Sequence, residues 1–119
     1  MPRLRVRNLT RGTIVADSAE IADSSRKRRT GLLKHPGLEP GQGLWIVPCE
    51  AVHTFGMKFP IDVLFLNKQW KVLKIRREMG RRGMAVSLLA HSVLELPAGA
   101  AAAAQTQVGD QLDLEKYDA

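Results

Sequence analysis

The sequence predicts a single, mainly β domain with one short α-helix near residues 24–34. The chain has 119 residues, the length of one domain with one core. Ten Gly and six Pro favour many turns, and the aromatic content is only 5%. From residue 44 onwards, short apolar segments are separated by Pro, Gly, Asn or charged residues, which is typical of successive short strands. We therefore expect one domain over residues 1–119.

The first two strands are expected before residue 22. Leu4 and Val6 alternate with arginines, the period-two pattern of a half-buried strand, and the row of guanidinium groups favours an edge position. Thr10, Arg11 and Gly12 then supply a turn. A second strand is expected over residues 13–21.

The helix is predicted from its two ends. Asp23-Ser24-Ser25 provides N-cap residues, helix formers continue to Lys34, and His35-Pro36-Gly37 ends the helix. Four cations occupy residues 26–29, where the helix dipole disfavours positive charge by a few tenths of a kcal/mol each. This mismatch indicates that these cations serve another purpose.

The later strands are expected in apolar segments with clear boundaries. A hairpin is predicted at residues 67–69, a polar loop at 76–83 and a short Ala-rich helical turn at 97–104. The predicted strands are LWIVP (44–48), VHTFGMKFP (52–60), IDVLFLN (61–67), WKVLKI (70–75), SVLELP (92–97) and a last strand through Leu112 and Leu114.

The chain is basic, with a formal net charge of +6. Residues 1–29 contain eight basic and three acidic residues, and residues 68–82 contain seven basic residues and one acidic residue. These segments predict either a solvated basic face or a surface for a polyanion such as nucleic acid, although the aromatic side chains that usually assist nucleic-acid binding are scarce. The candidate contacts are Arg3, Arg5, Arg7, Lys71, Lys74, Arg76, Arg77, Arg81 and Arg82.

Several classes of protein lose support from missing motifs. Cys49 is the only cysteine, so no intramolecular disulfide forms. No apolar run has the length of a signal peptide or a membrane span, which predicts a cytoplasmic protein. The three histidines are far apart and no phosphate-binding glycine loop is present, so we expect no metal and no cofactor.

Two carboxylates stand out because each interrupts an apolar strand. Asp62 lies in IDVLFL and Glu95 lies in VLEL, and a buried carboxylate needs hydrogen bonds or an opposite charge. If they face one cleft, they can share a proton, hold a cation or bind a basic ligand group. Alternatively, Asp62 is a structural hydrogen-bond acceptor and Glu95 a surface residue paired with an arginine.

His53 and Met57 fall on the same face of the predicted strand at 52–60. A histidine in this position is either a core residue or a pocket residue that donates a hydrogen bond or acts as an acid or base. His53 and Met57, the carboxylates Asp62 and Glu95, and Arg28 as a counter-charge together predict a binding module. Its expected ligand is small and polar or cationic. The alternatives are polyanion binding and an acid–base hydrolase or isomerase that uses Asp62 or Glu95 with His53. Whether the protein is an enzyme stays open.

An ordered set of motifs resembles the family called domain of unknown function 192. The resemblance covers about residues 13–114 and implies a jelly-roll-like β-sandwich with the helix of Arg28 at one side. It also implies that Met57, Asp62, Glu95 and Gly99 hold positions characteristic of the family, and it implies no activity. Its motifs are Arg28-x-x-Gly31-Leu32, Gly43-Leu44-Trp45, His53-Thr54-Phe55-Gly56-Met57-Lys58-Phe59-Pro60-Ile61-Asp62, Val93-Leu94-Glu95-Leu96-Pro97-Ala98-Gly99 and Gly109-Asp110.

Overall fold

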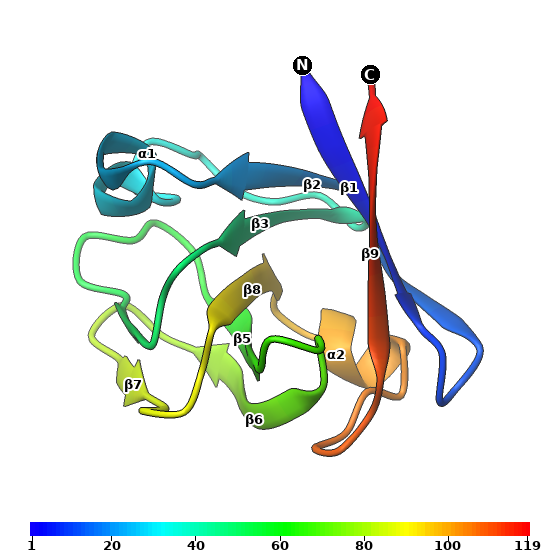
Figure 1. Cartoon of the computed structure of the whole chain (residues 1–119). Coiled ribbons are helices and arrows are strands. Elements are labelled where there is room, and N and C mark those ends of the chain that lie inside the picture. Colours follow the sequence, from blue (N-terminus) through cyan, green and yellow to red (C-terminus); the bar gives the residue numbers. More distant parts are fainter.

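Nine strands and two short helices form the fold, which confirms the predicted mainly β class (Figure 1). The computed structural model describes residues 1–119. The strands are β1 (Pro2–Asn8), β2 (Thr13–Ala22), β3 (Gln42–Ile46), β4 (Ala51–His53), β5 (Ile61–Leu66), β6 (Val72–Met79), β7 (Met84–Val86), β8 (Ser92–Pro97) and β9 (Leu112–Asp118). The helices are α1 (Ser25–Thr30) and α2 (Ala100–Ala103).

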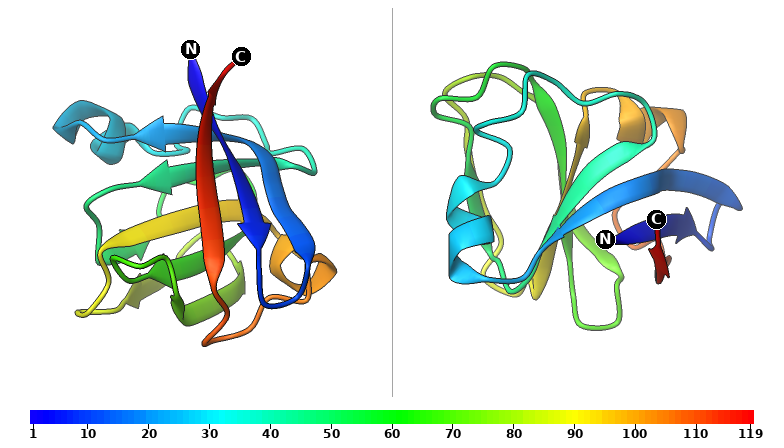
Figure 2. Two further views of the ribbon diagram at one scale, coloured as in Figure 1. Left: turned by 45° about the vertical axis from the view of Figure 1, so that its right-hand side comes forward. Right: turned by 90° about the horizontal axis from the view of Figure 1, so that it is seen from above.

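One large sheet and one small sheet hold these strands. The large sheet has seven strands in the order β6-β5-β8-β3-β2-β1-β9, and the small sheet pairs β4 with β7. Within the large sheet only β2 and β3 run parallel. The prediction that β1 is an edge strand is wrong, because β9 pairs along its whole length (Figure 2). Leu4 and Val6 on β1 are accordingly buried within the sheet's core.

The two edges of the large sheet meet at one end. The amide of Val72 donates to the carbonyl of Asp110 at 2.9 Å, and the amide of Gly109 donates to the carbonyl of Val72 at 2.8 Å. A β-bridge between Lys71 and Gln111 lies beside these bonds. The sheet therefore curls around its concave face and encloses the larger of two cores.

Side-chain alternation on β5 divides the protein into these two cores. Leu64 and Leu66 belong to the cluster that the curled sheet encloses, which we call the inner core. Ile61, Val63 and Phe65 belong to a second cluster, the outer core, on the opposite face of the strand. All five side chains are fully buried, which explains the uninterrupted apolar sequence of β5. The small sheet covers the outer core with Val52 and Ala85, so the fold has two layers there.

The helix is shorter than the sequence predicts. Ser24 is its N-cap as expected, since the side chain accepts a hydrogen bond from the amide of Lys27. The helix ends at Gly31, whose φ of 49° is favourable for glycine, rather than at Lys34. Leu32 then turns inward and is buried in the outer core. The gain from burying Leu32 accounts for the early end of the helix.

Two further strand predictions need correction. The segment predicted as a strand over 52–60 is extended only to His53 and then forms turns. In contrast, β6 continues to Met79 through part of the predicted polar loop, because Met79 is buried in the outer core. The strand β7 was not predicted, since its three residues are too few to show a pattern.

The acidic C-terminal segment is tied to the basic N-terminal segment by ion pairs. Asp110 is 2% exposed and accepts hydrogen bonds from the side chains of Asn8 and Arg11 and from the amide of Gln107. Burial raises the pKa of Asp110, but the hydrogen bonds from these three residues outweigh it and hold the pKa below its ordinary value. Arg5 pairs with Glu115 at 3.3 Å on the neighbouring strand.

Candidate functional site

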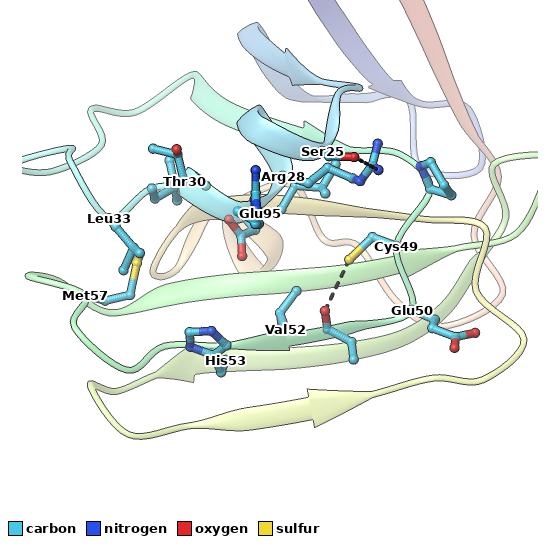
Figure 3. Close-up of a pocket in the computed structure, with 16 residues that line it drawn as sticks. Ser25, Arg28, Thr30, Leu33, Cys49, Glu50, Val52, His53, Met57 and Glu95 are labelled. Atoms are coloured by element: carbon cyan, nitrogen blue, oxygen red, sulfur yellow. Dashed lines mark hydrogen bonds between the residues drawn. The ribbon is translucent and has the colours of Figure 1, made fainter.

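A cavity of about 540 Å³ opens between α1, the segment that leads into β4, and strand β8 (Figure 3). Arg28 and Leu33 line it from the helix side, and Cys49 and His53 line it from the opposite side. Its volume is in the range of small-molecule sites. The cavity thus combines apolar walls with a few polar side chains.

Glu95 stands at the floor of this cavity. On β8 it lies opposite Leu44 and Val63 of the neighbouring strands, so its side chain projects toward the outer core. The residue is 5% exposed, and its carboxyl makes neither a hydrogen bond nor an ion pair within the chain. Burial alone raises the pKa of Glu95 to about 7. Figure 3 shows the carboxyl beneath α1, between Met57 and Cys49.

Arg28 lies at the rim without pairing to Glu95. Its guanidinium donates to the carbonyl of Val47 at 3.4 Å and to the hydroxyl of Ser25 at 3.3 Å. Both distances are long for hydrogen bonds, so these contacts are weak. Arg28, the predicted counter-charge, therefore lines the same cavity as Glu95 but remains free to donate a hydrogen bond to a ligand.

The thiol of Cys49 forms part of the cavity wall. Its Sγ donates to the carbonyl of Ala51 at 3.2 Å. Burial raises the pKa of the Cys49 thiol above its ordinary value, and the nearby Glu95 acts in the same direction. The group is thus a neutral thiol at neutral pH, which makes it a poor nucleophile.

His53 and Met57 both line the cavity, as the binding hypothesis requires. Met57 is 6% exposed and belongs to the outer core, so it is a fixed apolar wall. His53 is exposed, and its ring stacks on Phe55 with centroids 5.5 Å apart. The interpretation of His53 as a core histidine does not fit this exposure.

Asp62 does not reach the cavity. It lies opposite Leu96 on β8, so its side chain projects toward the inner core, on the face opposite to Glu95. The prediction that both carboxylates face one cleft is wrong. Glu95 pairs with Val63, the neighbour of Asp62, and successive residues of a strand point to opposite faces of the sheet. Acid–base chemistry that uses both carboxylates consequently lacks a shared site.

Asp62 instead accepts three backbone hydrogen bonds. The amides of Glu78, Gly99 and Ala101 donate to its oxygens at 2.8, 3.1 and 2.9 Å. Asp62 is fully buried, so these bonds supply the partners that a carboxylate in an apolar strand requires. They also join β6 and the start of α2 to β5.

Sequence reasoning missed most of the cavity. Ser25 and Arg29 on α1, Ile46 and residues 48–52 also line it, and the fold brings them together from separate parts of the sequence. The available signal was the cluster of cations at residues 26–29. The predicted mismatch with the helix dipole is wrong, because the helix ends at Thr30 and Lys27, Arg28 and Arg29 lie in its last turn, where the dipole favours positive charge. Two of the four, Arg28 and Arg29, line the cavity.

Most of the candidate polyanion contacts are held within the chain. Arg3 pairs with Glu20, and Arg5 pairs with Glu115. Lys74, Arg76 and Arg77 each donate to a backbone carbonyl, those of Val86, Met84 and Thr106. Arg7, Lys71, Arg81 and Arg82 make no side-chain hydrogen bond or ion pair. The basic residues are therefore divided into a larger bound group and a smaller free group.

Other classes of site receive no support from the geometry. No three metal-binding side chains of His, Cys, Asp or Glu come together. No helix has the length and apolar character to cross a membrane. The fold and the cavity define a small β domain with a polar pocket beside the helix of its N-terminal half.

Comparison with known proteins identifies the family. The profile of DUF192, described as "Uncharacterized ACR", matches residues 6–114, and the chain belongs to this family. The resemblance drawn from the motifs is thereby confirmed. A UPF0127 protein of Thermococcus sibiricus is 29% identical over 113 residues, which cover 91% of this chain and 73% of that protein.

Two crystal structures share the fold. A protein of Sinorhizobium meliloti 1021, described as a "putative transcription regulator", aligns with a TM-score of 0.83 and 22% identity over 95% of this chain and 92% of its own. A protein of unknown function from Novosphingobium aromaticivorans aligns with a TM-score of 0.80 and 19% identity over 93% and 83% of the two chains. At these identities the likeness concerns the fold alone.

Proposed function

We propose that this protein is a small binding module whose cavity takes a polar ligand with a cationic group. The observation that carries the proposal is Glu95, a buried carboxyl without a partner at the floor of an open cavity. A buried carboxylate is unfavourable until an opposite charge or hydrogen-bond donors reach it. A protonated amine or guanidinium on the ligand supplies both.

The rim indicates what else the ligand carries. Arg28 and Arg29 at the mouth of the cavity would repel a ligand that is only cationic. A hydrogen-bond acceptor or an anionic group on the ligand would turn this repulsion into attraction. The weakly bound guanidinium of Arg28 is free to donate hydrogen bonds to such a group. The proposed ligand is therefore a small polar molecule with a cation at one end and an acceptor at the other.

The proposal predicts that such ligands raise the melting temperature. L-lysine and L-arginine carry both groups, whereas putrescine carries cations alone, so we expect the first two to stabilise the protein more strongly. At ten times its dissociation constant, a ligand that binds only the folded state raises the melting temperature by about 5 °C. Thermal-shift measurements at pH 8, where Glu95 is ionised, check this. Glu95→Gln should abolish the shift.

A charge-matched variant provides the control. Glu39→Gln removes the same charge from an exposed residue outside the cavity and should leave the shift unchanged. Calorimetry at pH 6 adds a second readout, because a cation that ionises Glu95 releases about one proton on binding. An equal thermal shift in wild type and Glu95→Gln, or none with any of the three probes, would contradict the proposal.

We further propose that the protein works in the cytoplasm. Cys49 is a free cysteine that lines the cavity, and a reducing compartment keeps such a thiol from being oxidised.

A further inference from the structure

A second cavity, of about 440 Å³, lies between residues 55–58 and the loop of residues 80–83. It shares Met57 with the Glu95 cavity. Its other lining residues are Phe55, Gly56, Lys58, Arg81 and Arg82, so three cations and no acidic residue surround it. The proposed function does not use this cavity.

The buried residue Thr54 fixes the two sides of this cavity to each other. Its amide donates to the carbonyl of Gly83 at 2.9 Å, and its hydroxyl accepts from the amide of Gly83 at 2.6 Å and contacts the carbonyl of Gly80. A Cβ at Gly83 would lie 2.7 Å from the terminal methyl of Met79 and 3.1 Å from the hydroxyl oxygen of Thr54, so a side chain there would displace Met79. Arg81 and Arg82 are thus held by their backbone opposite Lys58, not placed there by a loose loop.

The three cations have no partner within the chain. Arg81, Arg82 and Lys58 make no ion pair and no side-chain hydrogen bond, whereas Lys74, Arg76 and Arg77 on the adjoining strand all donate to carbonyls. Gathering like charges around one cavity is unfavourable unless an anion neutralises them. A phosphate group, with several acceptor oxygens, suits such a cluster.

An aromatic platform accompanies the cations. Phe55 is 49% exposed although it is a large apolar side chain, and one face of its ring is supported by the stacked ring of His53. An exposed ring beside arginines is the combination that binds bases, because every base offers a flat face for stacking. Phe55 lines the same cavity as these three cations.

We propose that this second cavity binds a nucleoside phosphate, with the base stacked on Phe55 and the phosphates held by Lys58, Arg81 and Arg82. Its volume suits a single nucleotide rather than a long strand. The inference does not depend on the ligand of the Glu95 cavity, since Phe55, Lys58, Arg81 and Arg82 do not line that cavity.

Titration of three probes separates the two contributions. ATP carries a base and phosphates, inorganic triphosphate carries phosphates alone, and adenosine carries the base alone. At 150 mM salt we expect ATP to bind about tenfold more tightly than triphosphate, because its base stacks on Phe55, and we expect adenosine to bind most weakly. Chemical shifts of backbone amides in residues 54–58 and 80–83 locate the site.

Variants at exposed positions test the residues. Arg81→Gln with Arg82→Gln should weaken ATP binding at least tenfold, and Phe55→Leu should weaken ATP binding without changing triphosphate binding. Lys34→Gln with Lys116→Gln removes the same charge from exposed residues elsewhere and should change the affinity less than twofold. Glu95→Gln should leave ATP binding unchanged, which distinguishes this site from the Glu95 cavity.

Three results would overturn the inference. Equal losses in the two double variants would show that net charge, not this cavity, attracts ATP. Equal affinity for ATP and triphosphate would remove the role of Phe55. Binding of a ten-residue oligothymidine without binding of ATP would assign the basic residues to nucleic acid instead.

Discussion

Replacing Asp62 with alanine is expected to lower the free energy of unfolding by about 3–5 kcal/mol. The variant removes the fully buried acceptor of three amides; the hydrogen bond from Ala101 is buried, and those from Glu78 and Gly99 are partly buried. Each unsatisfied buried donor costs about 1–3 kcal/mol, less whatever water recovers in the space left by the side chain. Small domains have only about 5–15 kcal/mol in total, so the loss is a large fraction of the stability. Denaturation with urea measures it.

Asp62→Asn provides a graded comparison. The amide retains the shape of the carboxyl but offers one acceptor oxygen instead of two, and its NH2 group faces a donor. We expect a smaller loss than in Asp62→Ala, because fewer amides remain unsatisfied. Asp113→Ala, a change in a side chain without hydrogen bonds on β9, serves as the control and should cost less than 1 kcal/mol. A loss of this small size in Asp62→Ala would show that the three hydrogen bonds contribute little.

The case of Asp62 shows where sequence reasoning stops. The apolar sequence of residues 61–66 was sufficient to predict a buried strand, and a carboxylate within it was sufficient to predict a need for partners. The donors are 16, 37 and 39 residues away in the chain, so no local pattern identifies them. The structural interpretation of Asp62, which the sequence left open, agrees with these bonds.

The alternation of side chains between the two faces of β5 and β8 explains why the candidate site was predicted only in part. Both faces of β5 and β8 are apolar, so neither strand shows the alternation that would assign a face to Asp62 or Glu95. The facing of each carboxylate follows from the register, Asp62 opposite Leu96 and Val63 opposite Glu95, which depends on pairing across the sheet. Arg28, His53, Met57 and Glu95 do line one cavity, although α1, β4 and β8 are far apart in the sequence.

Wild-type protein is expected to lose stability as pH rises from about 5 to 8, by about 3 kcal/mol, through Glu95 alone. Burial raises the pKa of Glu95 from 4.5 to about 7 in the folded state. Between these two values the folded protein keeps a proton that the unfolded chain has released. Stability therefore falls with rising pH across this window and levels off above it.

Other carboxylates act in the opposite direction, so a variant has to isolate Glu95. Hydrogen bonds hold the pKa of Asp110 below its ordinary value, and its contribution is lost as pH falls, not as it rises. The difference in unfolding free energy between Glu95→Gln and wild type cancels such contributions. It should grow in favour of the variant from pH 5 to pH 8 and then stay constant.

Urea denaturation at one-unit intervals from pH 4.5 to 8.5 gives this difference directly. Glu39→Gln, which removes an exposed carboxylate, should show no such growth. A difference that is independent of pH would mean that Glu95 ionises with an ordinary pKa, and the buried, unpartnered carboxyl would then no longer support a cationic ligand. If the difference grows as expected, ionised Glu95 lowers the stability of the folded protein above pH 7. A cation bound beside Glu95 can restore this stability, which links the pH profile to the proposed binding site.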